Sequence, residues 1–172
     1  MPVLSPENPG IRMVNRRVLY FDRLAEAEYT IEDVATVLGR KQRFGDHAPR
    51  PYSVAEHLVH ASNLYARNPK GALMHDAPEW LLGDLLTPIK KRTSGFSELE
   101  DEVEADMARR FNYTPCHDPV FKVVDNILFQ CEHAALFDQP EVYNIEVPFQ
   151  FWKPKAAKKE FLKRFKYLSL DC

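Results

Sequence analysis

A histidine and an aspartate inside an otherwise apolar run most constrain how this chain can fold. His75 and Asp76 follow Ala72-Leu73-Met74 and are followed closely by Trp80-Leu81-Leu82. The apolar neighbours indicate a buried segment, and buried polar groups need partners inside the protein. An imidazole next to a carboxylate offers a divalent metal one nitrogen and one oxygen ligand. A metal needs further ligands, so the pair directs attention to polar residues on other helices.

Two other stretches with helical spacing each carry one polar residue that suits a metal. One contains His57 and the other contains Asp125, where an unpartnered carboxylate would be costly. The apolar stripes around them are Val54, Leu58, Ala61 and Tyr65, and Val120, Phe121, Val124, Leu128 and Cys131. The predicted ligand set is His57, His75, Asp76 and Asp125.

Two nitrogen and two oxygen ligands suit one divalent ion of Mn, Co, Zn, Fe or Mg. Four protein ligands leave room for water if the ion is five- or six-coordinate. Such a water becomes a nucleophile near neutral pH, and the ion also withdraws charge from a phosphoryl oxygen. The pattern therefore favours metal-assisted hydrolysis.

The motifs that contain these residues resemble those of the HD-domain phosphohydrolase superfamily, whose pattern is His, then His-Asp, then a distant Asp. Within the superfamily, the chain is similar to small nucleotide hydrolases typified by the bacterial 5'-deoxynucleotidase and related phage and prophage proteins. The resemblance spans most of the chain. It rests on Tyr52–His57, His75–Glu79, Gly83–Lys90 and Val123–Asp125, with Arg43-Phe44-Gly45, Trp152-Lys153-Pro154 and Phe161–Phe165 in support.

The resemblance implies a role for each matching residue. It makes the four predicted ligands the holders of the ion. Glu79 would assist proton transfer, and Asp84 would position or activate the attacking water. The residues that would face the nucleotide are Arg43, Phe44 and Lys90. From the sequence alone, Arg43 can equally be a solvated member of a basic run.

Pro78 is a departure from the family pattern, in which small residues such as alanine or serine are usual at this position. Proline inside a helix removes a backbone hydrogen bond and crowds the preceding turn. We expect a kink just after the His-Asp pair, which would alter where Glu79 points. Glu132 lies seven residues after Asp125 on the same helical face, and we regard it as a reserve ligand or a partner of a ligand.

The fold that we predict is all-α: one HD-type helical bundle of about six helices over residues 1–172. The length suffices for one substantial core. Residues around 18–21 are predicted to form a short strand or extended arm. The helices are predicted at 31–39, 53–67, 71–82, 97–111, 119–137 and 154–168.

Composition excludes several other classes of protein. A formal net charge of -2 gives no basic field of the kind that a dedicated nucleic-acid binder needs. The three cysteines argue against a disulfide framework and indicate a cytoplasmic protein. Met1–Gly10 has no signal-like apolar core, and no run approaches about 18 apolar residues, so we expect no membrane partner. The resemblance to oligomeric relatives also suggests a homo-oligomer.

The sequence favours removal of the 5'-phosphate from deoxynucleoside monophosphates by a metal-activated water. One alternative is a triphosphohydrolase of the phage dATP type, which releases triphosphate from a deoxynucleoside triphosphate. Another is a nucleotide-binding regulatory module that hydrolyses little. A third is a structural metal site that only staples the bundle, although Glu79 and Asp84 beside the ligands favour catalysis.

Overall fold

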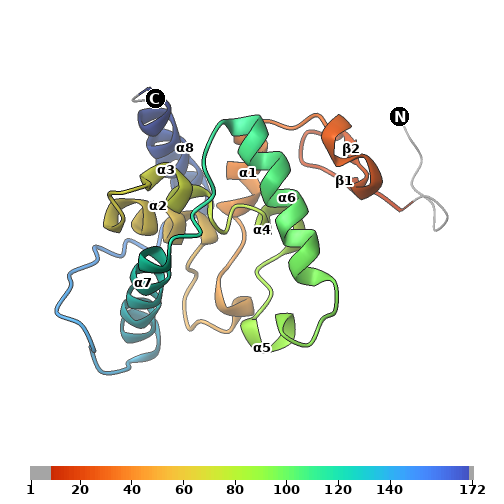
Figure 1. Cartoon of the computed structure of the whole chain (residues 1–172). Coiled ribbons are helices and arrows are strands. Elements are labelled where there is room, and N and C mark those ends of the chain that lie inside the picture. Colours follow the sequence, from red (N-terminus) through yellow and green to blue (C-terminus); the bar gives the residue numbers. More distant parts are fainter. Residues whose placement is uncertain (1–8, 171–172) are drawn as a thin grey trace.

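The structure is a computed structural model, in which residues 9–170 are described (Figure 1). Most of the Met1–Gly10 stretch and Cys172 lie outside the described residues. The described part is mostly helical, which confirms the all-α prediction. Its α-helices are α1 (Ile31–Leu38), α2 (Val54–Leu64), α3 (Pro69–Met74), α4 (Glu79–Leu82), α5 (Thr87–Lys90), α6 (Phe96–Phe111), α7 (Pro119–Phe137) and α8 (Pro154–Leu170).

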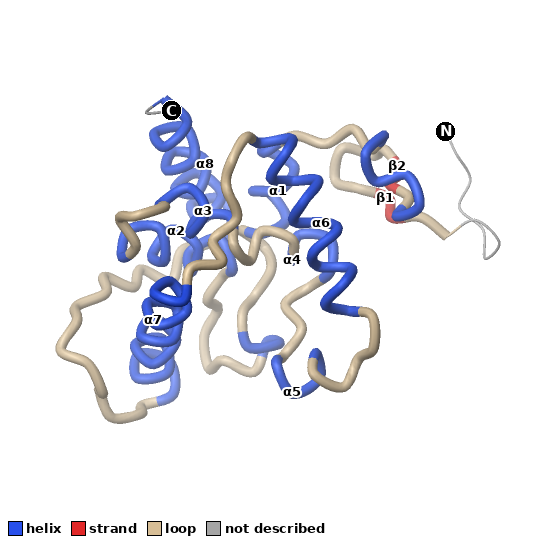
Figure 2. Tube along the Cα trace, in the orientation of Figure 1, coloured by secondary structure: helices blue, strands red, loops and turns tan. Residues whose placement is uncertain are grey.

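The only strands among the described residues form a small hairpin near the N-terminus (Figure 2). Strand β1 (Ile11–Arg12) pairs antiparallel with β2 (Val18–Leu19), with Ile11 opposite Leu19. The predicted strand near residues 18–21 is therefore present but short. It gives way to a 3-10 helix, η1 (Phe21–Glu26).

Helix α1 begins where the sequence predicts. The Thr30 side chain accepts a hydrogen bond from the Asp33 backbone N–H, and the Asp33 carboxylate accepts one from the Thr30 backbone N–H. This capping box satisfies two backbone donors that would otherwise lack a partner at the start of the helix. The helix ends at Leu38, just before Gly39, and packs mainly against α8.

Helix α2 lies at the centre of the bundle. It packs against α3 and α8, and also contacts α7. Nine consecutive residues, Val54–Ser62, are buried. Because a helix presents side chains in all directions over two turns, α2 is enclosed on every side. The polar residues within this buried stretch, including His57, therefore lie inside the protein.

The prediction of a single helix at 71–82 is wrong. The chain instead forms two helices, α3 and α4, with a turn at residues 75–78 between them. Pro78 has no N–H to continue the α-helical ladder. In its place, Ala77 N–H donates to Met74 O at 3.0 Å and Trp80 N–H donates to Ala77 O at 3.0 Å, which are tighter, three-residue bonds. Together with the one-turn helix α5, this break gives eight α-helices among the described residues rather than about six.

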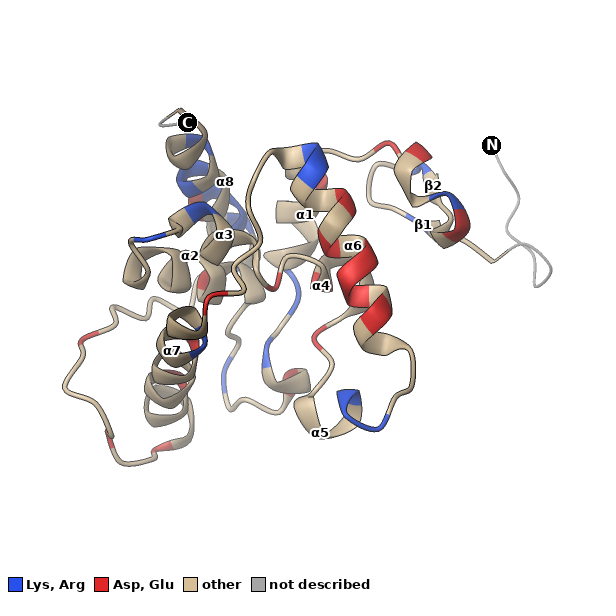
Figure 3. Ribbon diagram, viewed as in Figure 1, with Lys and Arg blue, Asp and Glu red and all other residues tan. Residues whose placement is uncertain are grey.

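Acidic residues predominate along α6, which ends with Arg109 and Arg110, and basic residues predominate among the charged residues of α8 (Figure 3). Helix α6 buries Val103 and Met107, and α8 buries Ala157 and Phe161. Both are therefore amphipathic helices with solvated charged faces. Among residues 9–170, no helix is both long enough and apolar enough to cross a membrane.

The segment between α7 and α8 has no regular secondary structure, and Glu56 of α2 anchors its end. The Glu56 carboxylate accepts hydrogen bonds from the backbone N–H groups of Gln150 (2.8 Å), Phe151 (2.8 Å) and Trp152 (2.6 Å). Burial acts to raise the pKa of Glu56. The bonds from His60 and the three N–H groups outweigh it and hold the pKa below the ordinary value of 4.5.

We predict that Glu56→Gln lowers the free energy of unfolding by about 2 kcal/mol at pH 7, because hydrogen bonds to a charged group are lost. A depressed folded-state pKa stabilises the protein above pH 4.5, and the contribution is lost as the pH falls through the folded-state pKa. The difference between wild type and variant should therefore be constant from pH 7 to 4.5 and shrink below it. Urea titrations at several pH values measure it, with exposed Glu146→Gln as the control. Equal stability of the two variants at pH 7 would show that Glu56 does not anchor this segment.

Candidate metal centre

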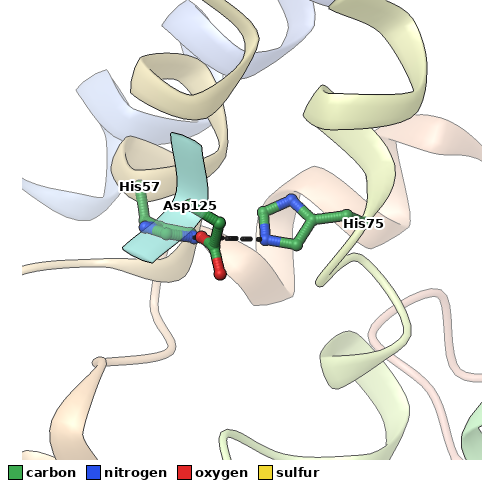
Figure 4. Close-up of side chains that lie close together, drawn as sticks. All are labelled: His57, His75 and Asp125. Carbon is green, nitrogen blue, oxygen red and sulfur yellow. Dashed lines mark hydrogen bonds and ion pairs between the residues drawn. The ribbon is translucent and has the colours of Figure 1, made fainter. Parts of the chain in front are cut away.

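Four side chains from three parts of the chain converge at α2, which itself supplies His57. His57 Nε2 lies 3.3 Å from His75 Nε2, 3.5 Å from Asp76 Oδ2 and 3.5 Å from Asp125 Oδ1. His75 Nε2 lies 3.3 Å from Asp76 Oδ2 and 3.6 Å from Asp125 Oδ1. Figure 4 shows the His57, His75 and Asp125 side chains directed toward one another.

These separations fit atoms that share one ion. Ligand atoms about 2.1 Å from a metal lie about 3.4 Å apart in a tetrahedral arrangement and about 3.0 Å apart in an octahedral one. The nitrogen–nitrogen and nitrogen–oxygen distances of 3.3–3.6 Å lie close to these spacings. His57, His75 and Asp125 each offer an atom within 4.8 Å of the others, so this cluster could hold a metal ion.

Hydrogen bonds to the far side of each imidazole direct Nε2 toward the cluster. His75 Nδ1 donates to the Ala72 carbonyl oxygen at 2.8 Å, because a carbonyl can only accept. His57 Nδ1 lies 2.6 Å from the carboxylate of Glu132 and donates to it. In a neutral ring the Nε2 lone pair is then free. Two such lone pairs face each other at 3.3 Å, a contact that favours a cation between them.

The charges of the cluster shift one another's protonation. Burial opposes ionisation of Asp76 and Asp125, but the neighbouring histidines outweigh it and lower the pKa of both carboxyl groups. Burial likewise disfavours a charged His75, but Asp76 and Asp125 outweigh it and raise its pKa, so a metal would have to displace the proton that this ring holds. The carboxylates are therefore ionised at neutral pH, in the form that a metal requires. Asp125 Oδ1 is buried and has no hydrogen-bond partner among the described residues.

A cleft of about 380 Å³ opens beside the cluster and brings together all the predicted site residues except the two buried histidines. Its lining includes Arg43, Phe44, Asp76, Glu79, Asp84, Lys90 and Asp125. A separate cavity of about 270 Å³ lies between α7 and residues 141–149 and contains none of the predicted site residues. Two of the potential ligands, Asp76 and Asp125, thus share one cleft with the predicted catalytic carboxylates.

Glu79 and Asp84 line this cleft, and one carboxylate oxygen of each is buried. Burial is the main cause that raises the pKa of both, and the charge of Asp76 adds to it. Glu79 Oε2 and Asp84 Oδ2 have no hydrogen-bond partner among the described residues. The turn at Pro78 therefore leaves Glu79 facing the same cleft as Asp76. Unpartnered buried carboxylate oxygens are costly, which is typical of a site built for a ligand.

Arg43 lies deeper than a solvated residue of a basic run would. Its side chain is 11% exposed, with Nη1 3.2 Å from Asp76 Oδ2 and Nη2 3.3 Å from Glu132 Oε2. Its guanidinium thus supports Asp76 at the wall of the cleft. The surface alternative does not describe this residue.

Phe44 lies between the cleft and α7. Its ring centroid is 6.0 Å from that of Phe129, 5.2 Å from His133 and 5.5 Å from Phe137. These rings recur every four residues along α7 and form one aromatic wall. Phe129 is also part of the cleft lining, so the wall reaches the site.

Lys90 lines the cleft but is paired. Its ammonium forms an ion pair with Glu100 of α6, and it lies 5.9 Å from the centroid of the Phe96 ring. Any phosphate that binds Lys90 would have to compete with Glu100 for its charge. The sequence did not predict this pair, because Lys90 and Glu100 belong to different helices.

Two further residues support the site. Lys41 Nζ donates to the backbone carbonyl of Glu79 at 2.8 Å and so holds the start of α4. The sequence placed Lys41 in a basic run and offered no signal for this contact. Glu132 is fully buried and contacts both His57 and Arg43. Helical spacing from Asp125 placed Glu132 on the correct face, but it left the contacts unassigned.

Comparison with known proteins gives similarity without a function. No family model matches the chain. It is 28% identical over 127 residues to the uncharacterized protein YfdR of Escherichia coli (strain K12), covering 73% of this chain and 71% of that protein. It is 38% identical over 114 residues to the uncharacterized protein RCAP_rcc00048 of Rhodobacter capsulatus, covering 58% of this chain and 57% of that protein.

We predict that Asp125→Ala weakens binding of Mn²⁺ or Zn²⁺ by more than about 100-fold, because loss of a ligand should exceed the effect of losing a residue that only supports one. Isothermal titration calorimetry measures the affinity, and circular dichroism checks the fold. The matched control is Asp101→Ala, an exposed aspartate on α6. Metal binding by Asp125→Ala at wild-type affinity would rule out this cluster as the metal centre.

Proposed function

We propose that the protein is a metal-dependent phosphohydrolase of the HD-domain type that removes the 5'-phosphate from deoxynucleoside monophosphates. One observation carries the proposal. A cluster able to hold a metal ion adjoins a cleft that also contains Glu79 and Asp84, each with one buried carboxylate oxygen that has no hydrogen-bond partner among the described residues. A metal site that only stapled the bundle would need neither a cleft nor these acids.

The donor set supports one divalent ion held by His57, His75, Asp76 and Asp125. Imidazole nitrogens and carboxylate oxygens suit Mn, Co, Zn, Fe or Mg. When bound, such an ion would polarise a phosphoryl oxygen. It would also lower the pKa of a bound water, which could then lose a proton and attack phosphorus. The residues of the protein have to transfer the proton and orient the substrate within the cleft.

Glu79 is the residue proposed to move the proton. Hydrolysis of a phosphate monoester forms a bond from water oxygen to phosphorus and breaks the bond to the sugar oxygen, which leaves with a proton. Burial raises the pKa of Glu79, so this group carries a proton at a higher pH than an ordinary carboxyl group. Asp84 follows Gly83, whose φ of 91° turns the chain at the end of α4, and would orient the attacking water.

The charge of the cleft supports a monophosphate over a triphosphate. Five carboxylates line it, against two cations. Both cations already have acidic partners, Asp76 and Glu132 for Arg43 and Glu100 for Lys90. A triphosphate brings about two more negative charges than a monophosphate and would find little positive charge to offset them. The aromatic wall of Phe44 and Phe129 is suited to stack a nucleobase.

We predict that the purified protein with Mn²⁺, Co²⁺, Zn²⁺ or Mg²⁺ releases orthophosphate from deoxynucleoside monophosphates faster than it releases triphosphate from deoxynucleoside triphosphates. The two products are measured separately. Faster release of triphosphate would replace the monophosphatase with the triphosphohydrolase. Binding without release of either product would favour a regulatory module, and failure to turn over any nucleotide with metal bound would remove the enzyme from consideration.

Glu79→Gln extends the same assay. The variant should bind metal like the wild type and hydrolyse its substrate ~100-fold more slowly or worse, as expected when a proton carrier is lost. Glu102→Gln, an exposed carboxylate on α6, is the control. Full turnover by Glu79→Gln would exclude this residue from the mechanism.

A further inference from the structure

The carboxylate of Glu132, on α7, contacts both His57 and Arg43, which belong to different parts of the site. Glu132 is fully buried. Its Oε1 lies 2.6 Å from His57 Nδ1 and accepts a hydrogen bond from the Tyr52 hydroxyl at 2.9 Å. Its Oε2 lies 3.3 Å from Arg43 Nη2. Two hydrogen-bond partners, Tyr52 and His57, and one ion-pair partner, Arg43, thus surround this carboxylate.

Stability alone does not explain a charge at this position. Desolvating a carboxylate costs several kcal/mol, and well-packed apolar residues can often replace a buried ion pair without loss of stability. Helix α7 is otherwise largely apolar, and Leu128 and Leu136, one turn before and one turn after Glu132, are both buried. An apolar side chain would therefore fit the packing of this face. What it could not do is hold His57 and Arg43.

We propose that Glu132 is a positioning residue that couples the metal ligand His57 to the cleft cation Arg43. This inference rests on the proposed metal centre and goes beyond it. Glu132 keeps the His57 proton on Nδ1, which fixes the ring and leaves Nε2 directed at the cluster.

Through Arg43, Glu132 also reaches a second potential ligand. The guanidinium lies between two carboxylates, with Nη2 on Glu132 and Nη1 3.2 Å from Asp76 Oδ2. Glu132 fixes one end of this fork, so the other end is held against Asp76. One buried carboxylate therefore orients His57 directly and Asp76 through Arg43.

Tyr52 provides a matched control, because it contacts the same Glu132 oxygen without touching a ligand. Its hydroxyl is 2.9 Å from Glu132 Oε1, and the residue is 1% exposed. Tyr52→Phe removes one hydrogen bond from Glu132 and keeps the carboxylate charge. If Glu132 acts by packing and general stability alone, Glu132→Gln and Tyr52→Phe should change metal affinity by similar small factors.

The first experiment measures Mn²⁺ affinity by titration calorimetry in wild type, Glu132→Gln, Glu132→Asp and Tyr52→Phe, with thermal unfolding as the check on folding. We expect Glu132→Gln to bind Mn²⁺ about 10- to 100-fold more weakly than wild type. Glu132→Asp keeps the charge but withdraws it from His57, so it should also bind weakly. Tyr52→Phe should bind close to wild type. Wild-type affinity in folded Glu132→Gln would overturn the proposal.

The second experiment needs no variant to fold. Nitrogen-15 NMR of histidine-labelled wild-type protein identifies which ring nitrogen of His57 carries the proton, with Zn²⁺ added as the metal. We expect the proton on Nδ1, and a proton on Nε2 would overturn the proposal. Failure of wild-type protein to hydrolyse any nucleotide would reject the proposed enzyme and leave this result standing, so the two failures are distinguishable.

Discussion

Burial of α2 on every side is the constraint on which the rest of the structure depends. Nine consecutive residues of this helix are buried, and two of them are Glu56 and His57. A polar group in such a place costs free energy unless it finds a partner inside the protein. Glu56 finds the backbone of residues 150–152, and His57 finds Glu132 and the cluster. The central helix thus fixes both the start of α8 and the site.

The site consists of successive shells of charge around His57. Asp76 and Asp125 lie within 3.5 Å of its Nε2, and Arg43 and Glu132 lie behind them. The outer groups neutralise part of the charge and restrict how the inner ones can turn. Glu79 Oε2 and Asp84 Oδ2, like Asp125 Oδ1, are buried and lack hydrogen-bond partners among the described residues. Such groups are stable only where a ligand or substrate compensates for them.

Local signals in the sequence predicted much of the fold. The helices predicted at 31–39, 53–67, 97–111, 119–137 and 154–168 correspond to α1, α2, α6, α7 and α8, because apolar spacing along the chain is a local signal. Helical spacing selected His57 and Asp125, and the adjacent pair supplied His75 and Asp76. The structure brings His57, His75 and Asp125 together as a group that could hold a metal, with Asp76 Oδ2 3.5 Å from His57 Nε2 and 3.3 Å from His75 Nε2. The prediction of one continuous helix at 71–82 was wrong, because it gave more weight to the apolar periodicity than to the helix-breaking effect of Pro78. We expected a kink within one helix, whereas a turn at residues 75–78 separates two helices.

Contacts between distant segments could not be predicted. The Lys90–Glu100 ion pair, the Lys41 contact to Glu79 and the Glu56 anchor each join elements whose packing no local pattern describes. Arg43 shows the limit best. The sequence allowed either a surface residue or a nucleotide contact, and the structure adds support of Asp76 by a buried guanidinium.

The central claim is that one divalent ion binds at the cluster around His57. A crystal structure of the protein grown with Mn²⁺, with anomalous scattering recorded to locate the ion, tests it most directly. We predict one strong anomalous peak about 2.0–2.3 Å from His57 Nε2, His75 Nε2, Asp76 Oδ2 and Asp125 Oδ1. A Mn²⁺ ion bound elsewhere on the protein, with no peak between these four atoms, would contradict it.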